Sequence, residues 1–203
     1  MNPVQEFDFI VIGSGLAGLT FALHAAEHGV VAILTKASLF ESNTSYAQGG
    51  IAAAVGESDS WELHEEDTLI AGAGLCDPAA VRKLVQNAPR AIEYLASIGA
   101  RFDREDVNLT DWALGREGGH SRNRIVHHAD KTGWEIERAM NEAVRKNPNI
   151  RIFENTFVTS LVIQDGQCVG ASAVVADGGE SVFLGRATML ATGGCGRLYA
   201  HTT

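Results

Sequence analysis

The stretch FDFIVIGSGLAG at residues 7–18 decides the fold of this chain. Its first half, Phe7–Ile12, consists almost entirely of β-branched and aromatic residues and predicts a short buried strand. Three glycines follow directly at Gly13, Gly15 and Gly18, in the spacing G-x-G-x-x-G. In a dinucleotide-binding turn these glycines allow the tight bend, the approach of the main chain to a pyrophosphate, and the close packing of a helix on the strand.

A helix and a second strand complete the motif. Apolar side chains recur at helical spacing from Gly15 to about His28, where Gly29 ends the predicted helix, and Val30–Leu34 reads as another buried strand. Free N–H groups at the start of such a helix bind phosphates. We therefore expect a β-α-β unit over residues 7–35 that binds a dinucleotide; a glycine-rich turn without a ligand is the alternative. The contacts are expected from Gly13, Ser14, Gly15, Leu16, Ala17 and Gly18.

The rest of the chain predicts an α/β fold, with a parallel sheet, helices on its faces and a small antiparallel β insertion near residues 157–184. Residues 37–56 are expected to form a long functional loop, and residues 100–128 are irregular and polar. Asp77-Pro78 is a helix-start signal, and Thr132 is the expected N-cap of the last helix. Further helices are expected at 60–72, 78–98 and 132–146, and further strands at 150–154, 157–164, 168–176, 181–184 and 187–191.

Charge and composition exclude several functions. The formal net charge is -9, which argues against nucleic acid as a partner. The chain contains neither a run of 18 apolar residues nor a basic leader, so no membrane partner and no secretion are expected. Cys76, Cys168 and Cys195 form no C-x-x-C pair, which indicates reduced thiols in a cytoplasmic protein. The adjacent histidines at 127–128 lack supporting ligand spacing, so no metal is expected.

The loop after the second strand carries the most informative segment, TSYAQGGIA at residues 44–52. Paired glycines with small and polar neighbours let a main chain lie against a flat ligand such as a flavin. A flexible surface loop is the alternative, although such loops rarely carry so many apolar residues. Lys36 stands where an acidic residue usually binds the adenosine ribose. It binds the ribose or a phosphate, or it is exposed to solvent, and the sequence favours neither.

Five motifs in order resemble the succinate dehydrogenase/fumarate reductase flavoprotein superfamily. Besides the first glycine motif and the loop at 44–52, they are HEEDTLIAG at 64–72, HADKTG at 128–133 and ATGG at 191–194. The resemblance implies FAD as cofactor and identifies residues 1–203 as an N-terminal FAD-binding domain. Its expected parts are the β-α-β unit at 7–35, a helical region at 60–146, the β insertion at 157–184 and the second flavin motif at 187–196. Further FAD contacts are implied for Lys36, Asn43, Thr44, Ser45, Tyr46, Ala47, Gln48, Gly49, Gly50, Val158, Thr192 and Gly193.

Two features select a branch of this superfamily. Asn43 stands where the membrane-bound members carry a histidine bonded covalently to FAD, so the resemblance implies noncovalent FAD. The segment REGGHS at 116–121 resembles the L-aspartate oxidase branch, in which it reaches the substrate. Glu117 would orient the substrate by pairing with its α-ammonium group, and it would repel plain dicarboxylates; a surface glutamate is the alternative. A basic cluster either surrounds a dicarboxylate or forms a solvated face paired with Asp130 and nearby acids. Its members are Arg116, His120, Arg122, Arg124, His127 and His128.

The implied activity is FAD-dependent oxidation of L-aspartate to iminoaspartate, with oxygen or fumarate as electron acceptor. In this branch the reaction is the first step of de novo NAD biosynthesis, and the product passes to quinolinate synthase. The family's catalytic residues belong to a capping domain, which with a helical C-terminal domain would lie beyond Thr203, so no catalytic residue is expected within residues 1–203. One alternative is a soluble fumarate reductase or succinate dehydrogenase flavoprotein. Another is a truncated FAD-binding module without catalysis of its own.

Overall fold

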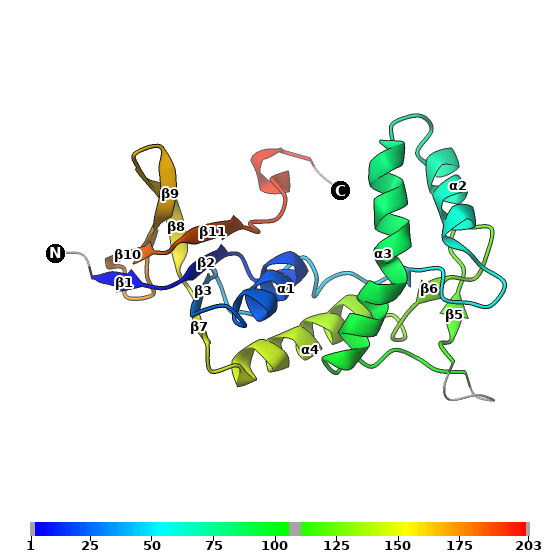
Figure 1. Ribbon diagram of the computed structural model, residues 1–203, viewed down its shortest axis with the longest axis horizontal. Helices are drawn as coiled ribbons and strands as arrows, with labels where there is room; N and C mark the ends of the chain where they lie inside the picture. The colour runs from blue at the N-terminus through cyan, green and yellow to red at the C-terminus, as the bar shows by residue number, and fades with distance from the viewer. Residues whose placement is uncertain (1–2, 106–110, 202–203) are drawn as a thin grey trace. The chain divides into compact units, whose positions relative to one another are not determined.

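The computed structural model describes residues 3–105 and 111–201, so part of the irregular segment, residues 106–110, lies outside the described residues. The chain divides into two compact units, which are described separately (Figure 1). The sheet unit comprises Met1–Ser45 and Met140–Thr203, and the helical unit comprises Tyr46–Ala139. Within the described residues, no helix has both the length and the apolar character needed to span a membrane.

A four-stranded parallel sheet forms the centre of the sheet unit, in the order β11-β2-β3-β7 (Figure 1). Every residue of β3 is buried, as expected for a parallel sheet that is covered on both faces. The predicted β-α-β unit and parallel sheet are therefore confirmed. The strands are β2 (Phe9–Ile12), β3 (Val31–Leu34), β7 (Ile150–Phe153) and β11 (Ala187–Leu190).

Helix α1, Leu16–Ala25, packs on this sheet through Leu19 and through small residues. The small buried residues include Gly18, Ala22 and Ala25, whereas Leu16 and Leu23 are only half-buried. The helix also ends three residues earlier than predicted. The predicted stop, Gly29, instead gives room to Asp8, whose carboxylate accepts a hydrogen bond from Val30 N at 2.7 Å.

A second four-stranded sheet has the order β1-β10-β9-β8. Its pairs are antiparallel, as predicted, except that the unpredicted β1 runs parallel to β10. Asp165 and Gly166 both have positive φ, 50° and 78°, which is the geometry of a type I′ hairpin turn. The strands are β1 (Val4–Glu6), β8 (Phe157–Gln164), β9 (Gln167–Val174) and β10 (Glu180–Leu184), and a 3-10 turn at Gly196–Leu198 follows β11.

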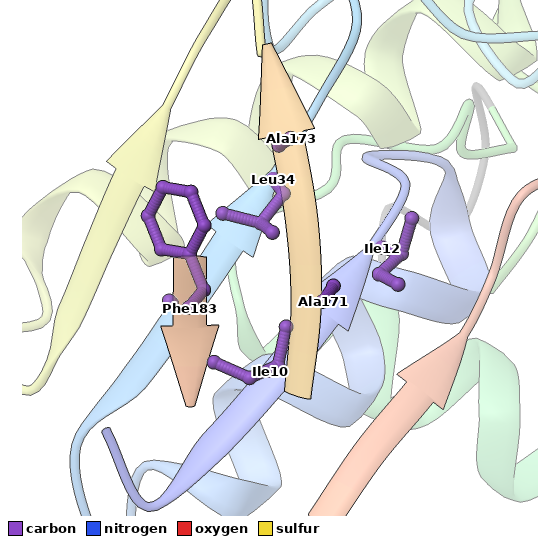
Figure 2. Packing of buried hydrophobic residues seen from close by; sticks show 7 residues of the cluster. Ile10, Ile12, Leu34, Ala171, Ala173 and Phe183 are labelled. Atoms are coloured by element: carbon purple, nitrogen blue, oxygen red, sulfur yellow. The ribbon is translucent and has the colours of Figure 1, made fainter. Parts of the chain in front are cut away.

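The core of the sheet unit lies between these two sheets (Figure 2). Phe183 is fully buried and packs edge-to-face on Phe153, with ring centroids 4.9 Å apart. Burying each large side chain stabilises the fold by about 1.5–3 kcal/mol. The cluster consists of Ile10, Ile12, Ala32, Leu34, Ala171, Ala173 and Phe183.

The helical unit contains an α2–α3 hairpin and a small three-stranded sheet in the order β4-β6-β5. The helix-start prediction at Asp77 is confirmed, because its carboxylate accepts hydrogen bonds from Ala79 N and Ala80 N. The N-cap prediction for Thr132 is wrong: Thr132 is already helical, and the carbonyl of Lys131 accepts the first helical bond. The elements are α2 (Trp61–Ala71), α3 (Pro78–Ser97), α4 (Thr132–Lys146, which continues into the sheet unit), β4 (Ile51–Ala52), β5 (Leu114–Gly115) and β6 (Ile125–Val126).

Candidate functional site

The first glycine turn packs so closely that side chains are excluded at two of its positions. Gly13 has a φ of +113°, and a Cβ there would overlap the carbonyl oxygen of Ala191. A Cβ on Gly18 would overlap the carbonyl oxygen of Gly13. These two glycines therefore fix the start of α1 against the ends of β2 and β11, which is the packing that the G-x-G-x-x-G spacing predicts.

Gly15, in contrast, has room for a Cβ atom. The atoms nearest to a Cβ at this position would be Thr44 Oγ1 at 3.7 Å and Ser42 Cβ at 4.0 Å. Gly15 is the N-cap of α1 and provides no side-chain cap. Leu16 N donates a hydrogen bond to Thr44 Oγ1 at 3.2 Å, and Ala17 is exposed. The start of α1 thus combines free space with the positive end of a helix dipole, an arrangement that suits a phosphate.

Two residues beside this turn differ in their orientation. Ser14 is buried, and its hydroxyl lies 3.0 Å from that of Thr35, so each side chain is satisfied inside the protein. Only the main chain of Ser14 is left to contact a ligand. Lys36 follows at the end of β3 and is exposed. This exposure is compatible with a lysine that binds the ribose or a phosphate and with a lysine that only faces solvent. Sequence reasoning missed Thr35, whose hydroxyl links the glycine turn to β3.

Asn43 lies close to the second glycine motif, although 150 positions separate Asn43 from Gly193. A Cβ on Gly193 would lie 4.0 Å from Asn43 Nδ2. A short turn holds this segment, because Ser45 Oγ donates to the carbonyl of Ser42 at 2.7 Å. Exposed Thr192 continues the chain just after β11. Both glycine motifs therefore lie at the carboxyl ends of parallel strands, where α/β sheets bind ligands.

The paired glycines of the 44–52 segment lie in the helical unit and are anchored to its small sheet. A Cβ on Gly50 would overlap Ile125 Cγ2 and lie 2.6 Å from the carbonyl oxygen of Val126. The carbonyl of Ala47 accepts a hydrogen bond from Gly133 N at 3.0 Å, at the start of α4. Both ends of this segment are therefore fixed, while the residues at its outer surface are exposed. The exposed residues are Tyr46, Ala47, Gln48 and Gly49.

Glu117 begins a tight turn between β5 and β6. His120 N donates to the carbonyl of Glu117 at 3.3 Å, and Gly119 has a φ of +85°, as the third residue of a type II turn requires. Glu117 itself is exposed, and its Oε1 lies 3.2 Å from the position that a Cβ on Gly49 would occupy. The structure thus brings the predicted substrate-orienting carboxylate beside the paired glycines.

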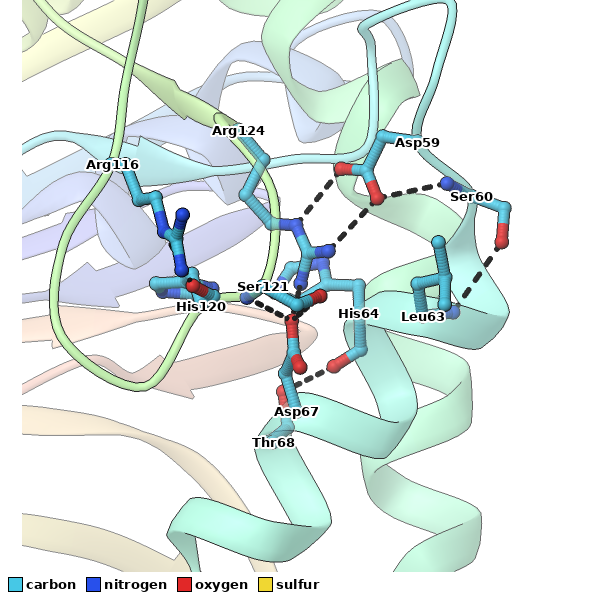
Figure 3. Close-up of polar contacts among 10 residues, drawn as sticks. All are labelled: Asp59, Ser60, Leu63, His64, Asp67, Thr68, Arg116, His120, Ser121 and Arg124. Carbon is cyan, nitrogen blue, oxygen red and sulfur yellow. Dashed lines mark hydrogen bonds and ion pairs between the residues drawn. The ribbon is translucent and has the colours of Figure 1, made fainter.

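Arg124 is completely buried between two carboxylates (Figure 3). Its Nε and Nη2 donate to the two oxygens of Asp59 at 2.8 Å, and its Nη1 donates to Asp67 Oδ2 at 2.8 Å. Burial acts to raise the pKa of Asp67, but hydrogen bonds from Ser121 and Arg124 outweigh it, so the pKa lies below its usual value. Arg124 therefore belongs to an internal ion-pair network and not to a basic surface that faces a substrate.

Two histidines lie beside this network (Figure 3). The rings of His64 and His120 are 5.7 Å apart, and the buried Nδ1 of each has no hydrogen-bond partner within the described residues. Burial lowers the pKa of His64, and the charges of Arg124 and His120 lower it further. His64 is therefore neutral at neutral pH.

The remaining histidines of the basic cluster are paired with an acid, as one of the alternatives predicted, but that acid is Asp103 and not Asp130. Asp103 Oδ2 lies 2.9 Å from His127 Nδ1 and accepts a hydrogen bond from Ala129 N at 2.7 Å. The other carboxylate oxygen lies 3.6 Å from His128 Nδ1. Within residues 3–105 and 111–201, no group of three or more His, Cys, Asp or Glu side chains could hold a metal ion.

Val158 occupies a different environment from the other residues for which FAD contacts were predicted. Its side chain lies on β8 and packs against the buried cluster between the two sheets. This packing explains an apolar residue at the position without any reference to a ligand. A contact between Val158 and the cofactor therefore remains a prediction.

Comparison with known proteins places the chain among flavin-binding domains. Residues 8–203 match the family described as FAD binding domain. The chain belongs to this family. FAD is therefore the cofactor of this domain, as the motifs predicted.

Two similar sequences, from a plant and a bacterium, carry a shared name. L-aspartate oxidase 2-a, chloroplastic, of Nicotiana tabacum is 51% identical over 208 residues, which cover 100% of this chain and 32% of that protein. L-aspartate oxidase 1 of Ralstonia nicotianae is 43% identical, over 98% of this chain and 39% of that protein. The chain thus spans about a third of the length of the tobacco relative and about two fifths of the length of the bacterial one.

Solved structures share the fold. A variant of E. coli quinol fumarate reductase superimposes with a TM-score of 0.91 and 30% identity, over 97% of this chain and 34% of that chain. Mycobacterium smegmatis Sdh1 gives a TM-score of 0.88 and 32% identity, over 97% and 35% of the two chains. These matches confirm the predicted α/β fold and the resemblance to the succinate dehydrogenase/fumarate reductase superfamily.

The residues present fit an FAD molecule. The start of α1 provides space over Gly15 and a helix N-terminus without a side-chain cap, both of which a pyrophosphate needs. The exposed segment 46–49 is fixed at both ends and carries a small side chain or none at Ala47 and Gly49, which leaves room for a flat ring system. Taken by itself, the start of α1 in the sheet unit thus suits a pyrophosphate, and segment 46–49 in the helical unit suits a flat ring system.

Proposed function

We propose that the protein containing this domain oxidises L-aspartate to iminoaspartate, with oxygen or fumarate as electron acceptor. Bound FAD would supply the redox chemistry by accepting a hydride from the substrate α-carbon. The proposal is supported by the 51% identity to a protein named L-aspartate oxidase and by the position of Glu117 beside Gly49. The position of Glu117 is the decisive observation, because it places a carboxylate beside the proposed flavin-binding segment.

A carboxylate at this position distinguishes amino acids from plain dicarboxylates. Aspartate carries an α-ammonium group that succinate and fumarate lack, and a charge-assisted hydrogen bond from that group to Glu117 would orient the α-carbon. The same carboxylate would repel a second carboxylate of a misplaced ligand. Since the Glu117 side chain is exposed, it is free to meet a substrate.

The cofactor contacts predicted from the sequence are part of this proposal. The main chain of residues 13–18 would hold the pyrophosphate, and Lys36 would contact the ribose or a phosphate. Residues 43–50, Val158, Thr192 and Gly193 would contact the rest of FAD. Asn43 cannot form the covalent bond of a tethering histidine, so FAD would bind noncovalently. Acid precipitation of the flavin-loaded protein should then leave all the flavin in the supernatant, and flavin in the pellet would contradict the proposal.

The product also has consequences for neighbouring reactions. An imine of this kind hydrolyses in water, so an enzyme that consumes it would need to receive it promptly. We therefore include transfer to quinolinate synthase, and with it a place in de novo NAD biosynthesis, in the proposal.

The cytoplasmic location remains a prediction from cysteine usage, since the tobacco relative is named as chloroplastic.

A fumarate reductase is the second candidate, because the fold matches the E. coli quinol fumarate reductase variant with a TM-score of 0.91. Glu117→Gln in the full-length protein separates the two functions, since it removes the charge and nearly preserves the shape. A charged hydrogen bond contributes about 1.5–3 kcal/mol. The kcat/KM for aspartate oxidation should therefore fall by about ten- to a hundredfold. Fumarate reduction should be affected much less.

Glu66→Gln is the matched control, because Glu66 is an exposed glutamate of α2 in the same unit. This variant should retain both activities. Equal losses on aspartate and fumarate in Glu117→Gln would show that Glu117 only supports its turn, and the assignment of aspartate would then fail. A flavin-loaded full-length protein that oxidises no substrate would favour the inert binding module.

A further inference from the structure

The turn that carries Glu117 is tied to α2 through Asp67. Ser121 follows the turn directly, and both its main-chain N and its Oγ donate to Asp67 Oδ2 at 2.8 Å (Figure 3). The turn also lies against the same helix, because a Cβ on Gly119 would be 3.6 Å from Ala71 Cβ. The end of the turn is therefore held by two hydrogen bonds to one charged oxygen.

Asp67 is itself held from the interior. The same oxygen accepts a third hydrogen bond from Nη1 of Arg124, whose side chain is completely buried and whose other nitrogens bind Asp59. Asp59 accepts a hydrogen bond from Ser60 N at 2.9 Å, and Ser60 caps α2. A buried, forked arginine–carboxylate pair has few alternative geometries. A rigid support, the Arg124 network, is thus formed by Asp59, Asp67, Ser121 and Arg124.

We propose that Asp67 and Ser121 are positioning residues, which set the place of Glu117 relative to Gly49 of the flavin-binding segment. The turn is closed locally, because His120 N donates to the carbonyl of Glu117 and Arg116 Nε donates to the carbonyl of His120 at 2.8 Å. These bonds set the shape of the turn, whereas Ser121, four positions after Glu117, attaches the turn to α2 through Asp67. The inference rests on the proposed function, because the place of Glu117 matters only if it meets a substrate ammonium.

Ser121 offers a cleaner test than Asp67. Asp67→Asn would remove a charge from beside fully buried Arg124, and such a variant is at risk of unfolding. Ser121 is exposed, and Ser121→Ala leaves its main-chain N–H and Arg124 still bound to Asp67. Ser121→Thr retains the hydroxyl and serves as the conservative variant. Ser97→Ala removes an exposed hydroxyl at the end of α3 and serves as the control.

Trypsin reports on the turn without any substrate or flavin. Exposed Arg116 and Arg122 flank the turn, and cleavage at them requires local opening of the segment. In the full-length protein, Ser121→Ala should raise the rate of cleavage at these two positions by about three- to tenfold, while Ser121→Thr and Ser97→Ala should match the unaltered protein. An unchanged cleavage rate in Ser121→Ala would overturn the proposal.

A double-mutant cycle then tests whether Ser121 acts through Glu117. In full-length protein with Glu117 present, Ser121→Ala should lower kcat/KM for aspartate by about three- to tenfold, and Ser121→Thr should restore most of it. In the Glu117→Gln background, Ser121→Ala should change this value by less than about twofold. Equal losses in both backgrounds would overturn the positioning role. The proposed function would fail separately, if the unaltered protein does not oxidise aspartate or if Glu117→Gln has no selective effect.

Discussion

The turn at Gly13–Gly18 and the turn at Glu117 are held in place by different means. In the sheet unit, main-chain atoms approach so closely that Gly13 and Gly18 have no room for a side chain. In the helical unit, the Glu117 turn has open space around Gly118 and is held through Ser121 by the buried Arg124 network. The positions that exclude a side chain, Gly13 and Gly18, belong to one short motif, whereas the ion-pair network joins residues that are far apart in the sequence.

These two kinds of support are not equally easy to recognise in a sequence. Positions that require glycine can be recognised from the sequence, because the glycines themselves recur at the spacing of the motif. An arginine held between two aspartates leaves no local pattern, since any surface arginine looks the same in the sequence. Three experiments test whether the two turns really depend on such different forces.

The first prediction concerns the steric support and has the largest expected effect. Gly13→Ala combines a strained positive φ, which costs about 1–3 kcal/mol, with an overlap against Ala191 O, which costs about 1–3 kcal/mol. The free energy of unfolding should therefore fall by about 2–6 kcal/mol, as measured from the denaturation midpoint at constant m.

Gly15→Val is the matched contrast, because a Cβ at Gly15 meets no atom closer than 3.7 Å. This variant should keep the far-ultraviolet circular dichroism of the folded protein but lose most of its FAD, since the branched side chain fills the proposed place of the pyrophosphate. Normal FAD content in folded Gly15→Val would show that the phosphates lie elsewhere. Equal stability losses at Gly13 and Gly15 would refute the steric distinction.

The second prediction concerns the electrostatic support. Arg124→Met leaves Asp59 and Asp67 buried without their cation, so the free energy of unfolding should fall by about 3–5 kcal/mol. Lys146→Met is the control, because the Lys146–Glu142 pair lies at the surface, with 73% and 52% of the two side chains exposed. That change should cost less than about 1 kcal/mol. If chemical denaturation gave similar losses of unfolding free energy for Arg124→Met and for the control, burial of the Arg124 network would not contribute to stability.

The third prediction concerns pH and is the smallest effect. The pKa of His64 is lowered in the folded protein, first by burial and then by Arg124 and His120, while Asp59 and Asp67 partly oppose this. The unfolded chain therefore binds a proton more readily, and stability should be lost as pH falls below about 6.5. Between pH 7.5 and 5.5, His64→Gln should lose about 1–3 °C less in Tm than the unaltered protein.

His28→Gln serves as the substitution control, because the His28 side chain is exposed. Losses from Asp67, Asp103 and Glu135, whose pKa values are also lowered, should appear only at more acidic pH. A pH profile that His64→Gln leaves unchanged would place the titrating group elsewhere.

Much of the fold could be predicted from the sequence, and the reasons are physical. Strands such as Val31–Leu34 and helices such as Pro78–Ser97 follow periodic patterns or explicit caps, and the structure contains them within a few residues of the prediction. Strand β1 could not be predicted, because three residues carry no period and their partner β10 lies almost 180 positions away.

The candidate site was less accessible to prediction. The glycines at 13, 15 and 18 and the position of Glu117 could be named from motifs, but the interior role of Arg124 could not. Its neighbours in the sequence, Arg122 and Asn123, are exposed, and its partners come from α2 and the segment before it. Long side chains find charged partners through tertiary packing, which leaves no local signal.

The pairing of β2 with β11 has a consequence for the order in which the protein folds during synthesis. Phe9 pairs with Ala187, so the central sheet joins segments that leave the ribosome roughly 180 residues apart, and the entropy of closing such a loop delays their contact. The helical unit, Tyr46–Ala139, is continuous in the sequence and emerges before β11 exists. During translation the edge of β2 that β11 will cover therefore stays unpaired, and a nascent chain stalled before residue 187 exposes this edge to aggregation.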